Sequence, residues 1–158
     1  MEEINYHVLK DEAIQFLGAQ KFLVLATSSN NRVTARTMGY VNKGLTIYFQ
    51  TDRNFLKVKQ IVRNPNVALC GANVQIEGVA KIRNHPFDTL NGEFIDLFKK
   101  KHPLAFNTYS HLKNEIVIEV EPTLITFWKY IDDKPLREFL YIKETKAQRE
   151  YYDTSQQK

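Results

Sequence analysis

The sequence predicts a mainly β protein, a small antiparallel barrel of six or seven strands with flanking helices. Apolar and polar residues alternate with a period of two in several segments of strand length, which is typical of half-buried strands. Turn-forming residues separate most of these segments by a few positions, and few segments have helical periodicity. Because parallel strands need long crossovers, these short connections favour an antiparallel barrel over a doubly wound parallel sheet.

The N-terminal part is expected to form one helix followed by three strands. An apolar stripe at helical spacing predicts the helix, which should end near Gly18. The stripe consists of Leu9, Ala13, Phe16 and Leu17. Strands are predicted over residues 22–27, 32–41 and 45–51, the last two joined by a hairpin in which Gly44 suits a positive φ angle.

A short basic helix follows, with Asn54 as its predicted N-cap. It should end before Pro65, because the residue that precedes a proline avoids the helical region. The residues expected to be buried are Phe55, Val58, Ile61 and Val62.

The remaining chain is expected to add further strands and one more helix. Strands are predicted over residues 67–72 and 74–82, where Gly78 indicates a bulge or a close backbone approach. A second amphipathic helix should bury Leu90, Phe94, Leu97 and Phe98 and end in Lys99, Lys100 and Lys101, cations that complement the helix dipole. Strands over 114–120, 122–130 and 136–142 complete a single domain over residues 1–142. Residues 143–158 read as a polar tail, a frayed helix or disorder.

Composition and missing motifs narrow the functional classes. The chain has 158 residues, 43% of them hydrophobic, a formal net charge of +4 and a single cysteine. No signal peptide or apolar run of bilayer length is evident, so we expect a cytoplasmic protein with no membrane contact. Four histidines share no helical spacing and Cys70 has no CxxC partner, which argues against a metal site. The glycine-rich and nucleophile motifs of Rossmann, P-loop and hydrolase enzymes are also missing.

The charge excess is concentrated in one segment. Residues 51–63 contain four cations and one acid, at the predicted start of the basic helix. Because a helix N-terminus already presents unpaired N–H groups and a positive dipole end, cations there indicate an anion site, with a solvated basic face as the alternative. Arg36 shares a strand face with Met38 and Tyr40, which suits a flat, partly anionic ligand or an edge-strand pair with a local carboxylate.

Four segments resemble a known family in order and spacing. They are residues 36–40 (RTMGY), 44–51 (GLTIYFQT), 57–61 (KVKQI) and 64–69 (NPNVAL), and they resemble the flavin-binding core of the pyridoxamine 5′-phosphate oxidase-like split-barrel proteins. The resemblance covers about residues 17–82 and resumes weakly at 125–128 (ITFW), where that family often carries a tryptophan.

The resemblance implies an FMN-binding Greek-key split barrel that forms a homodimer, with the cofactor between the two subunits. It implies that Lys57 and Thr51 hold the phosphate, that Arg36 holds the cofactor, and that the partner's tryptophan approaches the flavin ring. The full set of implied cofactor-binding residues is Arg36, Thr37, Met38, Gln50, Thr51, Arg53, Asn54, Lys57 and Trp128.

Three departures argue against pyridoxamine phosphate as the substrate. Phe55 stands where the true oxidases have a phosphate-binding serine, so that Arg53 and Asn54 are expected to substitute. Val41 replaces a substrate-binding lysine, and no Arg-Leu-His signature follows Trp128.

The expected function is therefore hydride or electron transfer between FMN and a small substrate or a reduced nicotinamide nucleotide, with no clear catalytic acid or base among the side chains. Two alternatives stay open. One is a sensor or storage protein that binds flavin without turnover, or that holds haem or a deazaflavin. The other is a basic barrel that binds nucleic acid, although no aromatic stacking platform is evident for one.

Overall fold

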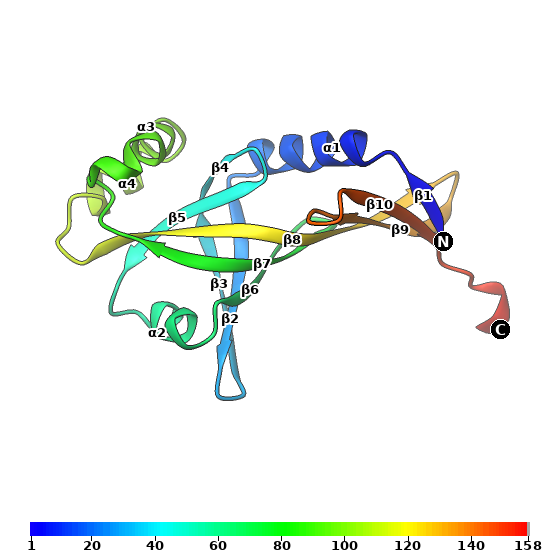
Figure 1. Ribbon diagram of the computed structural model, residues 1–158, viewed down its shortest axis with the longest axis horizontal. Coiled ribbons are helices and arrows are strands. Elements are labelled where there is room, and N and C mark those ends of the chain that lie inside the picture. The colour runs from blue at the N-terminus through cyan, green and yellow to red at the C-terminus, as the bar shows by residue number, and fades with distance from the viewer. Residues whose placement is uncertain (158) are drawn as a thin grey trace.

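The computed structural model of the protein describes residues 1–157, and strands predominate in it (Figure 1). The strands are β1 (Glu2–Ile4), β2 (Phe22–Ser29), β3 (Arg32–Gly39), β4 (Val41–Lys43), β5 (Thr46–Asp52), β6 (Asn66–Gly71), β7 (Val74–Arg83), β8 (Glu115–Ile131), β9 (Lys134–Tyr141) and β10 (Lys146–Tyr151). The helices are α1 (Tyr6–Ala19), α2 (Leu56–Arg63), α3 (Gly92–Lys101) and α4 (Pro103–Tyr109), with short 3-10 turns η1 (Thr89–Asn91) and η2 (Ser155–Gln157).

The strands close a barrel in which neighbouring strands run antiparallel. β3 pairs with β2, β2 with β6, β6 with β7, β7 with β8, β8 with β5, and β5 with β4. Only Tyr40 separates β3 from β4, so these two strands together occupy one place in the ring. The predicted antiparallel barrel with flanking helices is confirmed, and Gly44 has the expected positive φ of 60°.

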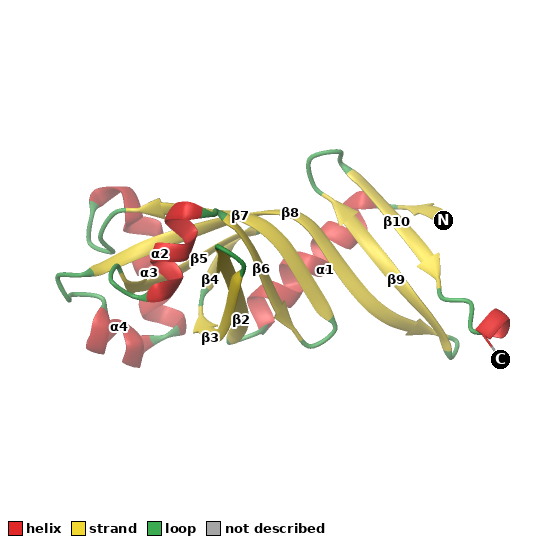
Figure 2. Cartoon of the chain, turned by 90° about the horizontal axis from the view of Figure 1, so that it is seen from below, coloured by secondary structure: helices red, strands yellow, loops and turns green. Residues whose placement is uncertain are grey.

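β8 is long enough to belong to the barrel and to an extension beyond it. Its first part pairs with β5, and its last part pairs with β9. Figure 2 shows β9 and β10 extending away from the barrel. The two strands predicted over 114–120 and 122–130 are thus one strand. The pairing of β7 with β8 shifts register at Gly78, which lies opposite Pro122. A Cβ added at Gly78 would lie only 2.8 Å from the Glu121 carbonyl oxygen.

The expectation of a frayed helix or disorder after residue 143 is wrong for β10. This strand pairs with both β9 and β1, so its backbone is part of the sheet. Its side chains are mostly polar, and a charge pair joins it to β9: Arg149 binds the buried Glu138, which also binds Lys129 of β8. A strand stabilised by ion pairs and one buried residue, Ala147, lacks the apolar pattern that predicts strands from sequence.

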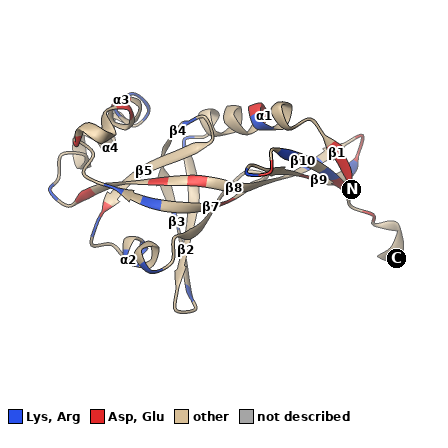
Figure 3. Ribbon diagram, in the orientation of Figure 1, with Lys and Arg blue, Asp and Glu red and all other residues tan. Residues whose placement is uncertain are grey.

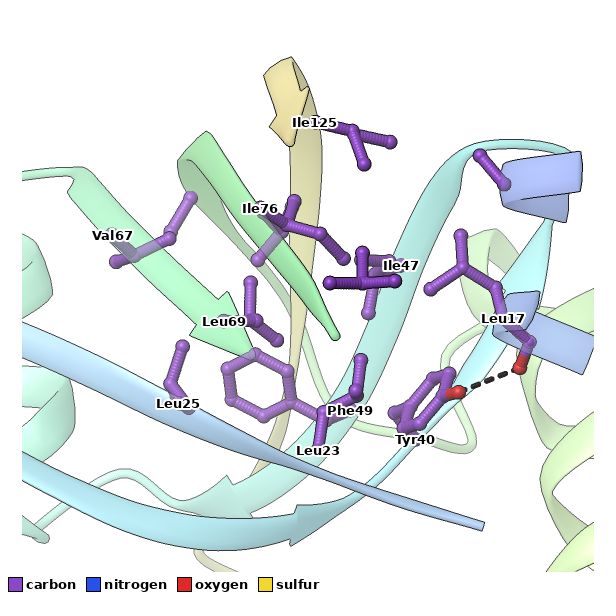
Figure 4. Packing of buried hydrophobic residues seen from close by; sticks show 14 of the residues in the cluster. Leu17, Leu23, Leu25, Tyr40, Ile47, Phe49, Val67, Leu69, Ile76 and Ile125 are labelled. Carbon is purple, nitrogen blue, oxygen red and sulfur yellow. Dashed lines mark hydrogen bonds between the residues drawn. The ribbon is translucent and has the colours of Figure 1, made fainter. Parts of the chain in front are cut away.

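The hydrophobic core fills the barrel and continues under α1 (Figure 4). Leu9, Ala13 and Leu17 of α1 are buried as predicted, and Phe16 packs against the core at its edge. Tyr40 is fully buried and donates a hydrogen bond of 2.6 Å to the Leu17 carbonyl oxygen, which ties the end of α1 to the barrel.

The two remaining helical regions differ from prediction in detail. α2 begins at Leu56 with Phe55 as its N-cap residue, and no side chain caps it because the Phe55 ring has no hydrogen-bond acceptor oxygen. Asn54 lies one residue before the cap and donates its backbone N–H to the Asp52 carboxylate. Val58 and Ile61 are buried as predicted, whereas Phe55 and Val62 are exposed, since α2 is short and contacts the barrel mainly through β2. In the second region Phe94 and Phe98 are buried, whereas Leu90 and Leu97 are exposed.

Two further features bear on the sequence expectations. None of the helices in residues 1–157 combines the length and apolar character that crossing a membrane requires. In the same residues no three His, Cys, Asp or Glu side chains gather in a way that could hold a metal ion.

Candidate cofactor site

A pocket of about 380 Å³ lies where the barrel is split. β4 pairs with β5 only through residues 41–43 and 46–48. Within the described chain, no strand pairing joins the end of β3 to the end of β5. Thr37 to Gly39 therefore form a strand edge with free backbone groups, a surface that readily accepts hydrogen bonds from a ligand. The pocket is lined by Phe22, Thr37, Met38, Gly39, Gln50, Thr51, Asp52, Phe55, Lys57, Phe98, His102, Ala105, Tyr109, Leu112 and Glu115.

Lys57 is the cation of this pocket. Its side chain comes from the first turn of α2, it is 9% exposed, and its Nζ donates a hydrogen bond of 3.0 Å to Thr51 Oγ1. Burial and then the nearby charge of Arg36 lower the pKa of Lys57, and Glu115 and Asp52 oppose this only in part. No carboxylate forms an ion pair with Lys57 among residues 1–157, so a buried cation faces the pocket with a hydroxyl as its hydrogen-bond partner.

Arg36 lies behind Lys57 and does not line the pocket. Its guanidinium donates hydrogen bonds to Thr27 Oγ1, Thr34 Oγ1 and the Leu25 carbonyl oxygen. Of the two interpretations from the sequence, the local carboxylate partner is not found among residues 1–157, and a direct contact with a flat ligand is not supported because Arg36 does not line the pocket. Because burial lowers the pKa of Arg36 and its charge lowers that of Lys57, the two cations form one positive region without an acid between them.

Helices α3 and α4 cover the other side of the pocket and bring in residues from far along the chain. Ser110 is fully buried and its hydroxyl donates a hydrogen bond of 2.7 Å to Gln50 Oε1. The Nε2 atom of His102 lies 2.9 Å from the Tyr40 carbonyl oxygen. The His102 ring also packs against Gly39, where an added Cβ would lie 3.2 Å from the Cε1 atom of His102. Burial lowers the pKa of His102, which favours the neutral imidazole. Because Nε2 of that ring donates to the Tyr40 carbonyl oxygen, Nδ1 is left as a hydrogen-bond acceptor.

Two carboxyl groups stand at the Lys57 end of the pocket. Asp52 and Glu115 are paired directly across β5 and β8. Asp52 accepts a hydrogen bond of 2.8 Å from the Asn54 backbone N–H, whereas Glu115 is 5% exposed and has no side-chain hydrogen bond within the described chain. Burial and then the charge of Asp52 raise the pKa of Glu115 to about 7, against the lowering effect of Lys57.

The structure gathers most of the implied cofactor residues but not all of them. Those in the pocket wall are Thr37, Met38, Gln50, Thr51 and Lys57. Arg53 and Asn54 do not line the pocket: both are exposed, and Arg53 borders a separate hollow over α2. Figure 3 shows the Lys and Arg residues of α2 on the face of the barrel opposite α1. Trp128 is 45% exposed and lies on the part of β8 that extends beyond the barrel. It does not line the pocket of its own chain.

The sequence reasoning missed His102, Ser110 and Glu115. His102 reaches Tyr40, and Ser110 reaches β5, only because α3 and α4 fold back over the barrel, a long-range contact that local spacing does not encode. Glu115 gave one weak signal, an acid immediately before the apolar run of residues 116–118.

The family model described as "Pyridoxamine 5′-phosphate oxidase" matches residues 9–129 of the chain. A curated relative, general stress protein 26 of Bacillus subtilis (strain 168), is 31% identical over 90 residues. This match covers 51% of the chain and 64% of the relative, so the chain spans less than two thirds of that protein's length.

Solved structures share the fold. General stress protein 26 from Bacillus anthracis str. Sterne is 28% identical, with a TM-score of 0.59 over 85% of this chain and 98% of that one. An FMN-binding protein from Nostoc punctiforme that is related to pyridoxamine 5′-phosphate oxidase is 15% identical, with a TM-score of 0.63 over 93% of this chain and 95% of that one. HutZ, the haem storage protein of Vibrio cholerae, is 14% identical, with a TM-score of 0.60 over 75% of this chain and 91% of that one.

Proposed function

Because the chain belongs to the pyridoxamine 5′-phosphate oxidase-like family of FMN-binding split-barrel proteins, we propose that its pocket binds FMN and that the protein is a flavin-dependent oxidoreductase. One observation carries the proposal. Lys57 is buried at the pocket, is reinforced by Arg36 behind it, and has no acid in an ion pair with it among residues 1–157. A buried cation in this state is stabilised by an anion, and a phosphate group fits the donors that Lys57 and Thr51 present.

The opposite end of the pocket fits a flat ring. The edge of β3 at Thr37 to Gly39 offers backbone donors and acceptors, and Phe22 and Phe98 supply apolar walls. FMN, when bound, supplies the hydride and electron chemistry, and the chain's residues bind it, orient it and exclude water. His102 borders the ring end of the pocket, where its free Nδ1 offers one acceptor.

The proposed electron donor is a reduced nicotinamide nucleotide, in keeping with the proposed cytoplasmic location, and the reduced flavin would pass electrons to a small substrate. Pyridoxamine phosphate does not fit as that substrate. Val41, which stands where the true oxidases have a lysine, is 3% exposed and packs beneath α3, so its position is not open to a ligand.

We further propose a homodimer that completes the site. Trp128 lies outside the pocket of its own chain, so it can contribute to a flavin site only across a subunit interface. Light scattering should give twice the chain mass of 18.5 kDa, and Trp128→Ala should weaken flavin binding without lowering the melting temperature of the flavin-free protein. A monomer that binds flavin normally would refute the shared site.

The purified protein tests the proposal directly. We expect a yellow protein with a flavin absorption spectrum, and loss of roughly 1–3 kcal/mol of binding energy in Lys57→Ala, which removes one charge-assisted bond. Arg36→Ala together with Lys57→Ala should add a smaller further loss, because Arg36 contributes its charge without lining the pocket. Lys59→Ala is the matched control, because Lys59 is exposed on the same helix and should not affect binding. Unchanged flavin retention in the double variant, with folding checked by circular dichroism, would contradict the assignment.

The same spectrum separates the alternatives. The likeness to a haem storage protein favours haem as the second candidate, and a haem protein would show a Soret band in place of the flavin bands. Stopped-flow reduction by NADH and NADPH separates an oxidoreductase from a protein that only stores flavin. A colourless protein that gains no flavin on titration, and whose binding to DNA or RNA falls steeply with salt, would favour the nucleic-acid reading.

A further inference from the structure

Glu115 is a nearly buried carboxyl group that faces the pocket without a partner. It is the first residue of β8, it is 5% exposed, and it lines the pocket together with Lys57 and Asp52. In residues 1–157 its carboxyl group takes part in no side-chain hydrogen bond and no ion pair. A carboxylate buried in this way is costly, so the geometry favours the neutral carboxylic acid, which carries one O–H donor.

The surroundings of this group agree with a neutral acid near pH 7. Burial and the adjacent Asp52 raise the pKa of Glu115 to about 7, and Lys57 is the one cation that acts against them. The other titratable groups in the pocket wall are His102 and Tyr109. Burial lowers the pKa of His102, so its imidazole stays neutral as the pH rises above 7 and adds no change of charge in that range.

We infer that Glu115 is a further FMN-binding residue of this pocket, which as a neutral carboxylic acid donates a hydrogen bond to the phosphate group that Lys57 holds. The inference rests on the proposed function, because the phosphate is that of FMN. It adds a donor at the end of the pocket where Phe55 offers none: the centroid of the Phe55 ring lies 4.7 Å from Lys57 Nζ, and the ring contributes only a cation–π contact.

In this arrangement, protonation of Glu115 and binding of the FMN phosphate are coupled. A protonated Glu115 donates to the phosphate, whereas an ionised Glu115 repels it, so the form that binds FMN well is the protonated one. The affinity is therefore full below the pKa of the free site and falls as the pH rises through about 7. For one proton the dissociation constant should increase by roughly 20-fold between pH 6.5 and 8.5.

The test is FMN titration of the flavin-free protein from pH 6.5 to 8.5, followed by quenching of flavin fluorescence. Three proteins are compared: wild type, Glu115→Gln and Asp52→Asn. Glu115→Gln keeps a neutral donor of similar shape, so its affinity should stay nearly constant over this range. Asp52→Asn removes a charge that raises the pKa of Glu115, so the fall in affinity should begin at lower pH than in the wild type.

The outcomes separate this role from that of a simple counter-ion to Lys57. Coupling predicts that wild type and Glu115→Gln bind equally at pH 6.5 and diverge above pH 7. A fixed counter-ion predicts that the variant binds more tightly by the same factor at every pH, and that result would overturn the inference while leaving FMN binding intact. Failure of all three proteins to bind FMN at any pH would instead refute the proposed function, and this inference with it.

Discussion

Replacing Glu115 by glutamine should stabilise the flavin-free protein at neutral pH. The carboxyl group has a pKa of about 7 in the folded protein and an ordinary value of 4.5, so between these values the folded state binds a proton that the unfolded state has released. Stability that depends on this proton is complete below about pH 4.5 and is lost as the pH rises through 7.

The magnitude follows from the two pKa values. Each tenfold change in the proton equilibrium corresponds to about 1.4 kcal/mol, so a pKa raised from 4.5 to about 7 limits the loss to about 3 kcal/mol. Water in the pocket screens part of this, and we expect the variant to exceed the wild type by about 1–3 kcal/mol above pH 7. Near pH 4.5 both side chains are largely neutral and the difference should approach zero.

Urea unfolding of flavin-free protein at pH values from 4.5 to 8.5 measures this difference, with equal m-values as the check that both proteins unfold alike. Flavin must be removed, because a bound ligand adds stability of its own. Glu144→Gln, which neutralises an exposed carboxylate in the turn between β9 and β10, is the matched control. A Glu115→Gln difference that is the same at pH 5 and pH 8 would refute a buried, proton-binding Glu115.

Three further substitutions probe the fold. Gly78→Ala should destabilise the protein by about 1–3 kcal/mol in urea unfolding, because its Cβ would lie 2.8 Å from a backbone oxygen of β8. Tyr40→Phe should cost about 1 kcal/mol, through loss of the 2.6 Å hydrogen bond to Leu17, and should lower the thermal midpoint. Burial alone would raise the pKa of Glu138, but its two bound cations hold that pKa below the ordinary value. Glu138→Gln should therefore destabilise the protein by about 2–4 kcal/mol at pH 7, and by less as the pH falls below 4.5.

Local signals in the sequence predicted the parts of the fold that local physics determines. The stripe of Leu9, Ala13 and Leu17 predicted the buried face of α1, and Gly44 predicted a positive φ in a hairpin. Gly78 predicted a close backbone approach, which the register shift in β7 and β8 explains. The first two features depend on residues a few positions apart or on a conformation that only glycine adopts easily, whereas Gly78 marks, by its missing side chain, a contact with the distant Glu121.

Features that depend on distant residues could not be predicted in the same way. Not every miss was of this kind: the bond from the Asn54 backbone N–H to Asp52 is a local turn, and the sequence analysis overlooked that Asp52 could form it ahead of an α2 that begins at Leu56. The polar strand β10 depends on charges in β9, and the pocket depends on α3 and α4 folding over β5. The resemblance supplied Lys57 and Thr51, but it could not supply Glu115, since no segment quoted for it includes β8 before residue 125.

The phosphate end of the pocket illustrates why such a residue matters. A serine hydroxyl is a donor at any pH, and this chain replaces it with the exposed Phe55, whose ring only borders Lys57. The side-chain donors that remain at this end are the Lys57 ammonium, the Thr51 hydroxyl and the acid of Glu115, and Glu115 is the one among them that titrates near pH 7. A donor that titrates near pH 7 gives a site whose affinity varies with pH where a hydroxyl would not. Restoring the hydroxyl with Phe55→Ser should therefore strengthen FMN binding most above pH 7, where Glu115 no longer donates.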